Sequence, residues 1–141
     1  MKIEPAPDAQ SIVEQLLARL DLGHVKPDKV VCTRSFGAKS RALARIWAMP
    51  RIWQVALGME ARYVIEVLSQ NFDELSREDK EKTLLHELLH IPKTFSGALV
   101  PHTCFGREID AEVEKLYEVY LKNKQKALFE LSKDGLLSVN D

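Results

Sequence analysis

The residues from His86 to His90 read His-Glu-Leu-Leu-His, and this pattern constrains the chain more than any other. On an α-helix, side chains four positions apart project from one face, about one turn apart. Two imidazoles placed in this way can bind one metal ion. Glu87 is rotated by about 100° around the helix axis from His86, so its carboxylate would stand beside the metal. A carboxylate there can take a proton from a metal-activated water, which predicts a zinc-hydrolase helix.

The sequence also predicts where this helix begins and ends. Ser76 is a suitable N-cap, and the two acidic side chains that follow it favour a first helical turn. Pro92 disfavours helical geometry in the residue before it, so the helix should end near Leu89 or Ile91. The two histidines therefore occupy its last turns, where the following loop can supply another ligand. The alternative to a metal site is that both histidines lie on a partly buried helix and form ordinary hydrogen bonds. This interpretation does not explain why Glu87 stands among leucines.

A third metal ligand has several candidates. Catalytic zinc usually has three protein ligands and an open position for water. We favour His102, twelve residues after His90, because the intervening loop contains glycine and prolines and can turn the chain back. The other candidates are three acids further along the chain: Glu108, Asp110 and Glu112. Cys104 leaves a second arrangement open, since its thiolate and three histidines would close a structural site without a water position.

The rest of the pattern predicts an α+β fold. Helical periodicity covers residues 8–22, strands are expected at residues 30–33, 43–48 and 62–68, and further helices at residues 50–57 and from 107 to at least 122. The sheet should therefore be small, with about three strands, and packed against the N-terminal helix and the histidine helix. We expect one domain over residues 1–141, with a leader (1–7) and a tail (about 133–141) at its periphery.

Three other features receive structural interpretations. The tryptophans Trp47 and Trp53 are expected to anchor the core, and Cys32 to be a small core residue. Residues 35–40 should form a turn. Their Gly-x-Lys-Ser sequence lacks the first glycine and the Gly-Lys pair of a phosphate-binding loop, which argues against nucleotide binding.

Charge is unevenly distributed along a chain whose net charge is −1. From Lys26 to Arg51 there are seven basic residues and one acid, while the segment from Glu108 to Glu118 is mostly acidic. The basic segment could contact nucleic acid, or it could be a solvated face that complements the acidic helix.

Composition also bears on where the protein works. Two cysteines are too few for a disulfide framework, and no apolar run is long enough to span a membrane. The first residues lack the apolar core of a signal peptide. We therefore expect a cytoplasmic protein without a membrane partner.

The motif region resembles a known family. The resemblance rests on His86-Glu87-Leu88-Leu89-His90-Ile91-Pro92-Lys93-Thr94-Phe95-Ser96-Gly97, on Pro101-His102, on Glu112-Val113-Glu114-Lys115-Leu116-Tyr117, and on upstream stretches from about residue 30. These residues resemble the archaeal predicted metallopeptidases, small zincins often compared with SprT-like minimal metalloproteases. The resemblance covers roughly residues 30–120. It implies a minimal zincin-like fold, zinc on His86, His90 and His102, and Glu87 as the catalytic acid and base.

The expected function is zinc-dependent hydrolysis of a peptide or protein substrate, with Glu87 moving the proton. Arg107, Tyr117 and Tyr120 are candidates to donate a hydrogen bond to the oxyanion, and an unpaired sheet edge could hold the substrate. Two alternatives stay open. One is a zinc hydrolase of another bond, such as an RNA phosphodiester. The other is a non-enzymatic, zinc-stabilised interaction module with Cys104 as the fourth ligand.

Overall fold

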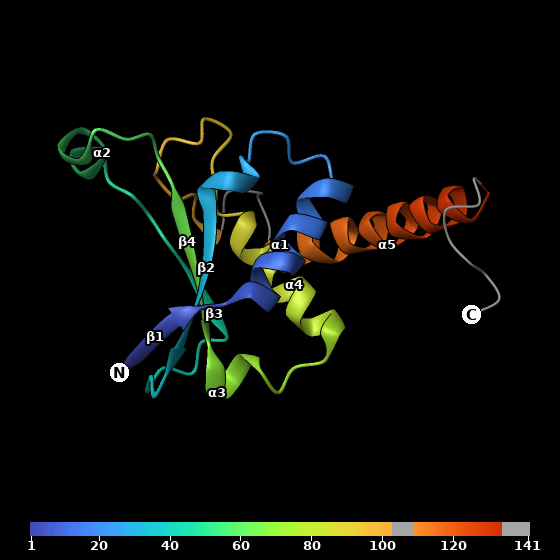
Figure 1. Cartoon of the computed structure of the whole chain (residues 1–141), viewed down its shortest axis with the longest axis horizontal. Coiled ribbons are helices and arrows are strands. Elements are labelled where there is room, and N and C mark those ends of the chain that lie inside the picture. The colour runs from blue at the N-terminus through green and yellow to red at the C-terminus, as the bar shows by residue number, and fades with distance from the viewer. Residues whose placement is uncertain (103–108, 134–141) are drawn as a thin grey trace.

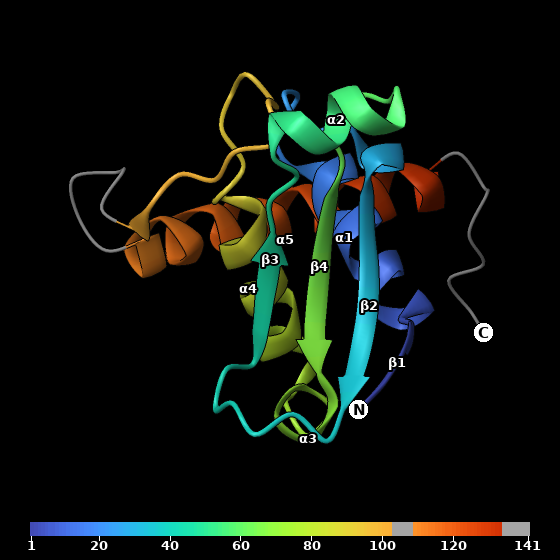
Figure 2. The ribbon, with the colours of Figure 1, turned by 90° about the vertical axis from the view of Figure 1, so that its left-hand side faces the viewer.

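A four-stranded sheet with the strand order β1-β2-β4-β3 lies at the centre of the computed structural model, which describes residues 1–102 and 109–133. The strands are β1 (Lys2–Pro5), β2 (Val30–Phe36), β3 (Ala44–Trp47) and β4 (Tyr63–Leu68). The two central strands, β2 and β4, run parallel, whereas β1 and β3 pair antiparallel with them at the two edges. Figure 2 shows the four strands side by side, with β3 at one edge.

The helices that build the core lie on one face of this sheet (Figure 1). They are α1 (Pro7–Arg19), α4 (Arg77–Leu88) and α5 (Ile109–Lys133), and two shorter helices, α2 (Arg51–Leu57) and α3 (Ser69–Phe72), precede and follow β4. A 3₁₀ turn, Pro27–Lys29, leads into β2. Helices α1 and α4 contact each other and the sheet, and α5 packs across both.

Alternation along β4 explains why the helices cover one face. Tyr63, Ile65 and Val67 are fully buried, and they lie on the same side of the strand because strand side chains alternate. They meet the apolar stripe of α1, which includes Ile12 and Leu16. Burial of these side chains is the main source of stability for a core of this kind.

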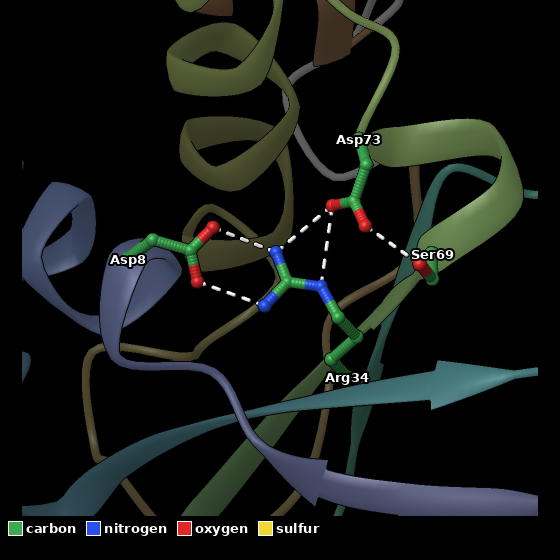
Figure 3. Close-up of polar contacts among 4 residues, drawn as sticks. All are labelled: Asp8, Arg34, Ser69 and Asp73. Atoms are coloured by element: carbon green, nitrogen blue, oxygen red, sulfur yellow. Dashed lines mark hydrogen bonds and ion pairs between the residues drawn. The ribbon is translucent and has the colours of Figure 1, made fainter.

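An ion-pair network fastens β2 to two helices (Figure 3). The guanidinium of Arg34 donates to both carboxylate oxygens of Asp8 at 2.8 and 2.7 Å. It also donates to Asp73, which accepts a further hydrogen bond from Ser69. The bond from Arg34 lowers the pKa of Asp8 to about 2. Arg34 is therefore occupied within the fold, although it belongs to the basic segment of the sequence.

The α+β class, the N-terminal helix and the capped histidine helix are confirmed. The count of three strands is wrong, because Lys2–Pro5 of the leader forms β1. This edge strand is mostly exposed and is held by backbone pairing with β2, so it has no apolar alternation to detect. Strand β2 also continues to Phe36, and the expected turn begins later, at Gly37, whose φ is +80°.

The interpretation of the tryptophans as core anchors is wrong. Trp47 is 54% exposed and Trp53 is 58% exposed. Trp47 is the last residue of β3 and donates to Glu66 at 2.9 Å, whereas Trp53 lies on α2, a helix without a buried residue. Cys32, by contrast, is buried in the core, as expected, and burial raises the pKa of its thiol to about 12.

Candidate metal centre

Helix α4 sets the position of the first two histidines. The Ser76 side chain accepts a hydrogen bond from the Asp79 backbone N–H and caps the helix start. On the opposite face, Leu84, Leu85 and Leu88 are buried in the core. Past Leu88 the helix tightens, because the His90 N–H donates to a carbonyl three residues back, that of Glu87, at 3.1 Å.

Three histidines converge beside the end of α4. One ring nitrogen each from His86, His90 and His102 lies within 4.8 Å of the other two, and these are the only such group among residues 1–102 and 109–133. The Nε2 atoms of His86 and His102 are 3.2 Å apart. Two nitrogens that bind zinc at its usual distance in a tetrahedral site are separated by about 3.3 Å. The donor set and its spacing therefore fit a zinc ion.

The outer nitrogens of two of these rings are held by hydrogen-bond partners. Nδ1 of His86 lies 3.0 Å from a carboxylate oxygen of Asp110, and Nδ1 of His90 lies 2.7 Å from the carbonyl oxygen of Val100. Each partner accepts a hydrogen bond from a protonated Nδ1, which leaves Nε2 free as a metal ligand. Burial lowers the pKa of His90, which favours the neutral form that binds a metal.

The loop between His90 and His102 is fixed by hydrogen bonds. The Gly97 N–H donates to the Tyr63 hydroxyl at 2.8 Å, and the Gly97 carbonyl accepts from the Met49 N–H at 2.8 Å. A Cβ at Gly97, where φ is +95°, would lie 2.3 Å from the Met49 oxygen. Only glycine fits this turn, which sends the chain back toward α4 and places His102 beside the other histidines.

Glu87 stands beside the three histidines and is 8% exposed. Burial raises the pKa of its carboxyl to about 7, although a hydrogen bond from the Ile46 backbone N–H acts in the opposite direction. A carboxyl group with a pKa near neutrality can both take and return a proton. This is the property that the sequence motif requires of Glu87.

A cleft of about 750 Å³ opens in front of these side chains, between α4, α5 and β3. Strand β3 is an edge strand, so one side of its backbone has no strand partner within the described part of the chain. The Leu43 carbonyl accepts from the Leu68 N–H of β4 at 3.0 Å. Because backbone groups alternate in direction, those of Ala44 and Ile46 point away from β4. The Ile46 N–H accordingly reaches Glu87.

The other residues that the sequence suggested as metal ligands or oxyanion donors are not found in those roles among the described residues. Tyr117 and Tyr120 do not face the cleft as oxyanion donors, because their hydroxyls donate to the buried Glu81 at 2.9 and 3.0 Å. Asp110 contacts His86 and is not part of the group of metal-binding side chains. Cys104, Arg107 and Glu108 lie outside the described residues. Glu112 is a described residue of α5, but it is not part of the group formed by His86, His90 and His102.

Several residues of the basic segment form ion pairs within the fold. Lys29 pairs with Glu60, Arg34 with two aspartates, and Arg45 with Glu66 at 2.8 Å. Their acidic partners lie on other elements and not in the acidic segment from Glu108 to Glu118, so these contacts do not show the expected pairing with the acidic helix.

Comparison with family models gives a match over most of the chain. Residues 1–127 match the model of a family described as "Putative phage metallopeptidase". No curated protein and no solved structure matches the chain significantly.

Proposed function

The chain belongs to the phage metallopeptidase family, and from this premise we propose that it is a zinc-dependent peptidase. His86, His90 and His102 would hold the metal, and Glu87 would move the proton. The observation that carries the proposal is the convergence of three histidine nitrogens within 4.8 Å beside a buried glutamate. Among residues 1–102 and 109–133 the three histidines are the whole donor group, and three histidines with an open fourth position are the arrangement of catalytic rather than structural zinc sites.

A zinc ion in this site would supply Lewis-acid chemistry, which acidifies a water and stabilises negative charge on the scissile carbonyl. Glu87 takes the proton of the attacking water as general base and returns it to the leaving amine as general acid. Its raised pKa, about 7, suits both steps near neutral pH. Asp110 and the Val100 carbonyl orient the rings of His86 and His90.

The free edge of β3 offers a place for the substrate backbone. An extended peptide can add to a sheet edge as a further strand and pair with its unpaired backbone groups. The outward-facing groups that remain for a substrate are the N–H and carbonyl of Ala44 and the carbonyl of Ile46, because the Ile46 N–H already bonds Glu87. A peptide on this edge would pass the histidines, so one of its bonds would lie next to Glu87.

Further parts of the proposal rest on sequence. They are zinc as the metal, a peptide or protein as the substrate, and a cytoplasmic location. They also include the resemblance to the archaeal predicted metallopeptidases and, through them, to SprT-like minimal metalloproteases. Among the described helices, none is long and apolar enough to cross a membrane. Contact with nucleic acid through the segment from Lys26 to Arg51 stays a prediction, and the ion pairs of Lys29, Arg34 and Arg45 do not favour it.

The test compares metal content and hydrolysis in matched variants. Glu87→Gln should keep the metal and lose cleavage of an unfolded protein substrate, because the amide cannot take the proton. His102→Ala should lose the metal as well. Glu118→Gln, at an exposed acid of α5, is the control and should keep both properties. Undiminished cleavage by Glu87→Gln would sink the mechanism.

The same assay separates the two alternatives. Cys104→Ser should keep the metal if the site is catalytic, whereas release of the metal would support a structural site closed by the thiolate. Salt-dependent RNA binding together with RNA cleavage, and no peptide cleavage, would support the phosphodiesterase.

A further inference from the structure

Helix α2 presents large apolar side chains and buries none of its residues. Ile52 is 75% exposed, Val55 69%, and Trp53 and Leu57 58% each, and Met59 just beyond the helix is 37% exposed. A helix that is apolar over most of its circumference is normally covered by another surface. We call these five side chains the apolar tip.

Polar contacts hold the apolar tip away from the core. Gln54 is the one residue of α2 that is not exposed, and its amide donates to the carbonyls of Met49 and Ser96 at 2.9 and 2.8 Å. The helix ends at Leu57, and Gly58 caps it in a left-handed conformation. Figure 1 shows α2 at one end of the sheet, away from α4 and α5. The fold therefore positions this helix without covering its apolar side chains.

The charges around the apolar tip are basic. Arg51 and Arg62 flank it, are exposed, and have no ion-pair partner among the described residues. Two acids lie close to these bases: Glu60, which is hydrogen-bonded by Lys29 and lies 3.9 Å from Lys26, and the exposed Asp28, directly before Lys29 in the 3₁₀ turn. Four basic residues (Lys26, Lys29, Arg51 and Arg62) thus face two acids, so an anionic surface would meet a net positive charge here.

We propose that the apolar tip docks on a lipid bilayer that contains anionic lipids. An interfacial helix inserts its apolar side chains below the headgroups, while basic side chains contact the anionic headgroups. Tryptophan suits this depth because its indole has both an apolar body and a polar N–H. The proposal departs from our sequence-based expectation of no membrane partner. That expectation considered only spanning segments, and an interfacial helix needs none.

Tryptophan fluorescence tests the proposal directly, because the chain contains only Trp47 and Trp53. In the full chain carrying Trp47→Phe, Trp53 reports on the apolar tip alone. Its emission should shift to shorter wavelength with vesicles of phosphatidylcholine and phosphatidylglycerol, and the protein should co-sediment with them. Vesicles of phosphatidylcholine alone should bind much more weakly, and added salt should weaken binding to the anionic vesicles.

Matched variants assign the binding to named side chains. Ile52→Ser with Val55→Ser, and separately Arg51→Gln with Arg62→Gln, should each weaken vesicle binding by about tenfold or more. The control is Leu128→Ser with Phe129→Ser, which removes exposed apolar side chains from α5 and should leave binding unchanged. Because all six side chains are exposed, thermal unfolding should confirm that every variant is folded.

Three outcomes would overturn the proposal. They are an absent spectral shift with anionic vesicles, equal loss of binding in the α5 control, and a shift that follows protein concentration without vesicles. The last result would assign the apolar tip to a second copy of the chain, and sedimentation velocity would show the dimer. None of these measurements depends on peptidase activity.

Discussion

The carboxylate of Asp110 lies 3.0 Å from Nδ1 of His86, whereas Nε2 of the same ring faces Nε2 of His102 at 3.2 Å. Asp110 is the second residue of α5, so the contact joins the beginning of one helix to the end of another. A carboxylate behind a histidine fixes its tautomer and makes its other nitrogen a better ligand. Asp110 is thus a positioning residue for His86.

We predict that Asp110→Asn lowers the affinity for zinc by about 10- to 100-fold. The fold should be unaffected, because the Asp110 side chain is mostly exposed. Competition with a chromophoric chelator measures the affinity. Glu118→Gln removes an exposed carboxylate further along the same helix and should bind zinc as tightly as the unmodified chain. Equal affinities for Asp110→Asn and the control would remove Asp110 from the site.

The relative placement of His86 and Glu87 is predictable from sequence, because both lie in the last turn of α4 and helical spacing fixes it. His90 lies two residues beyond the helix, where the bond from its N–H to the Glu87 carbonyl continues the turn. The Ser76 cap is predictable for the same reason, since it is a local hydrogen bond. The role of Asp110 is not predictable in this way. Its position depends on how α5 crosses α4, and the sequence alone shows only an acid near a candidate ligand.

The errors have a common physical origin. Strand β1 is held by backbone pairing at a sheet edge, which leaves no periodic apolar pattern. Trp47 and Trp53 belong in a core by hydrophobicity alone, yet α2 projects from the sheet and leaves Trp53 exposed. In both cases the tertiary arrangement, rather than the residue type, decides burial.

The loop that carries His102 should be sensitive to a single methyl group. In Gly97→Ala, the new Cβ would lie 2.3 Å from the Met49 oxygen and 2.5 Å from the Gln54 amide nitrogen. We expect a loss of stability of roughly 2–3 kcal/mol and weaker zinc binding, because the loop must move.

Gly37→Ala is the matched control for this loop. Gly37 also has a positive φ, of +80°, but a Cβ there meets nothing within 4 Å. It should cost about 1 kcal/mol from backbone strain and leave zinc binding unchanged. Thermal unfolding and chelator competition measure the two effects. Normal zinc affinity in Gly97→Ala would show that the loop does not position His102.

Acid should weaken the fold through Glu66. Its carboxylate accepts hydrogen bonds from Arg45, Ser35 and Trp47 on the sheet face opposite the helices. The bond from Arg45 is the largest cause that lowers the pKa of Glu66 to about 2, from an ordinary value of 4.5. A lowered pKa gives stability that is fully present above about pH 4.5 and is lost as the pH falls to about 2.

We therefore predict that the unmodified chain is more stable than Glu66→Gln by up to about 3 kcal/mol at pH 7. The difference should shrink between pH 4.5 and 2. Denaturant unfolding of the metal-free protein measures it without a contribution from metal release. Glu74→Gln, at an exposed carboxyl, should show no comparable trend. A difference between the chain and Glu66→Gln that is independent of pH would contradict the prediction.

The last prediction concerns Glu81, a buried residue of α4 that is hydrogen-bonded by two tyrosines of α5. Glu81 is 3% exposed, and its two carboxylate oxygens accept from Tyr117 and Tyr120, with Arg77 at 3.6 Å. A buried charge is tolerated only while its partners remain. Burial and the Glu81 carboxylate together raise the pKa of Tyr120 to about 12, so its hydroxyl stays a donor.

Removing the partners should therefore cost more than removing the charge. Tyr117→Phe with Tyr120→Phe should lower the free energy of unfolding by roughly 3 kcal/mol or more, because each hydroxyl bonds a charged group. Glu81→Gln should cost about 1 kcal/mol, since its amide oxygen still accepts. Adding Glu81→Leu to the double variant should recover most of the loss, because no buried polar group then lacks a partner. Urea unfolding of the four proteins measures these differences, and a triple variant less stable than the double variant would show that Glu81 is held by other contacts.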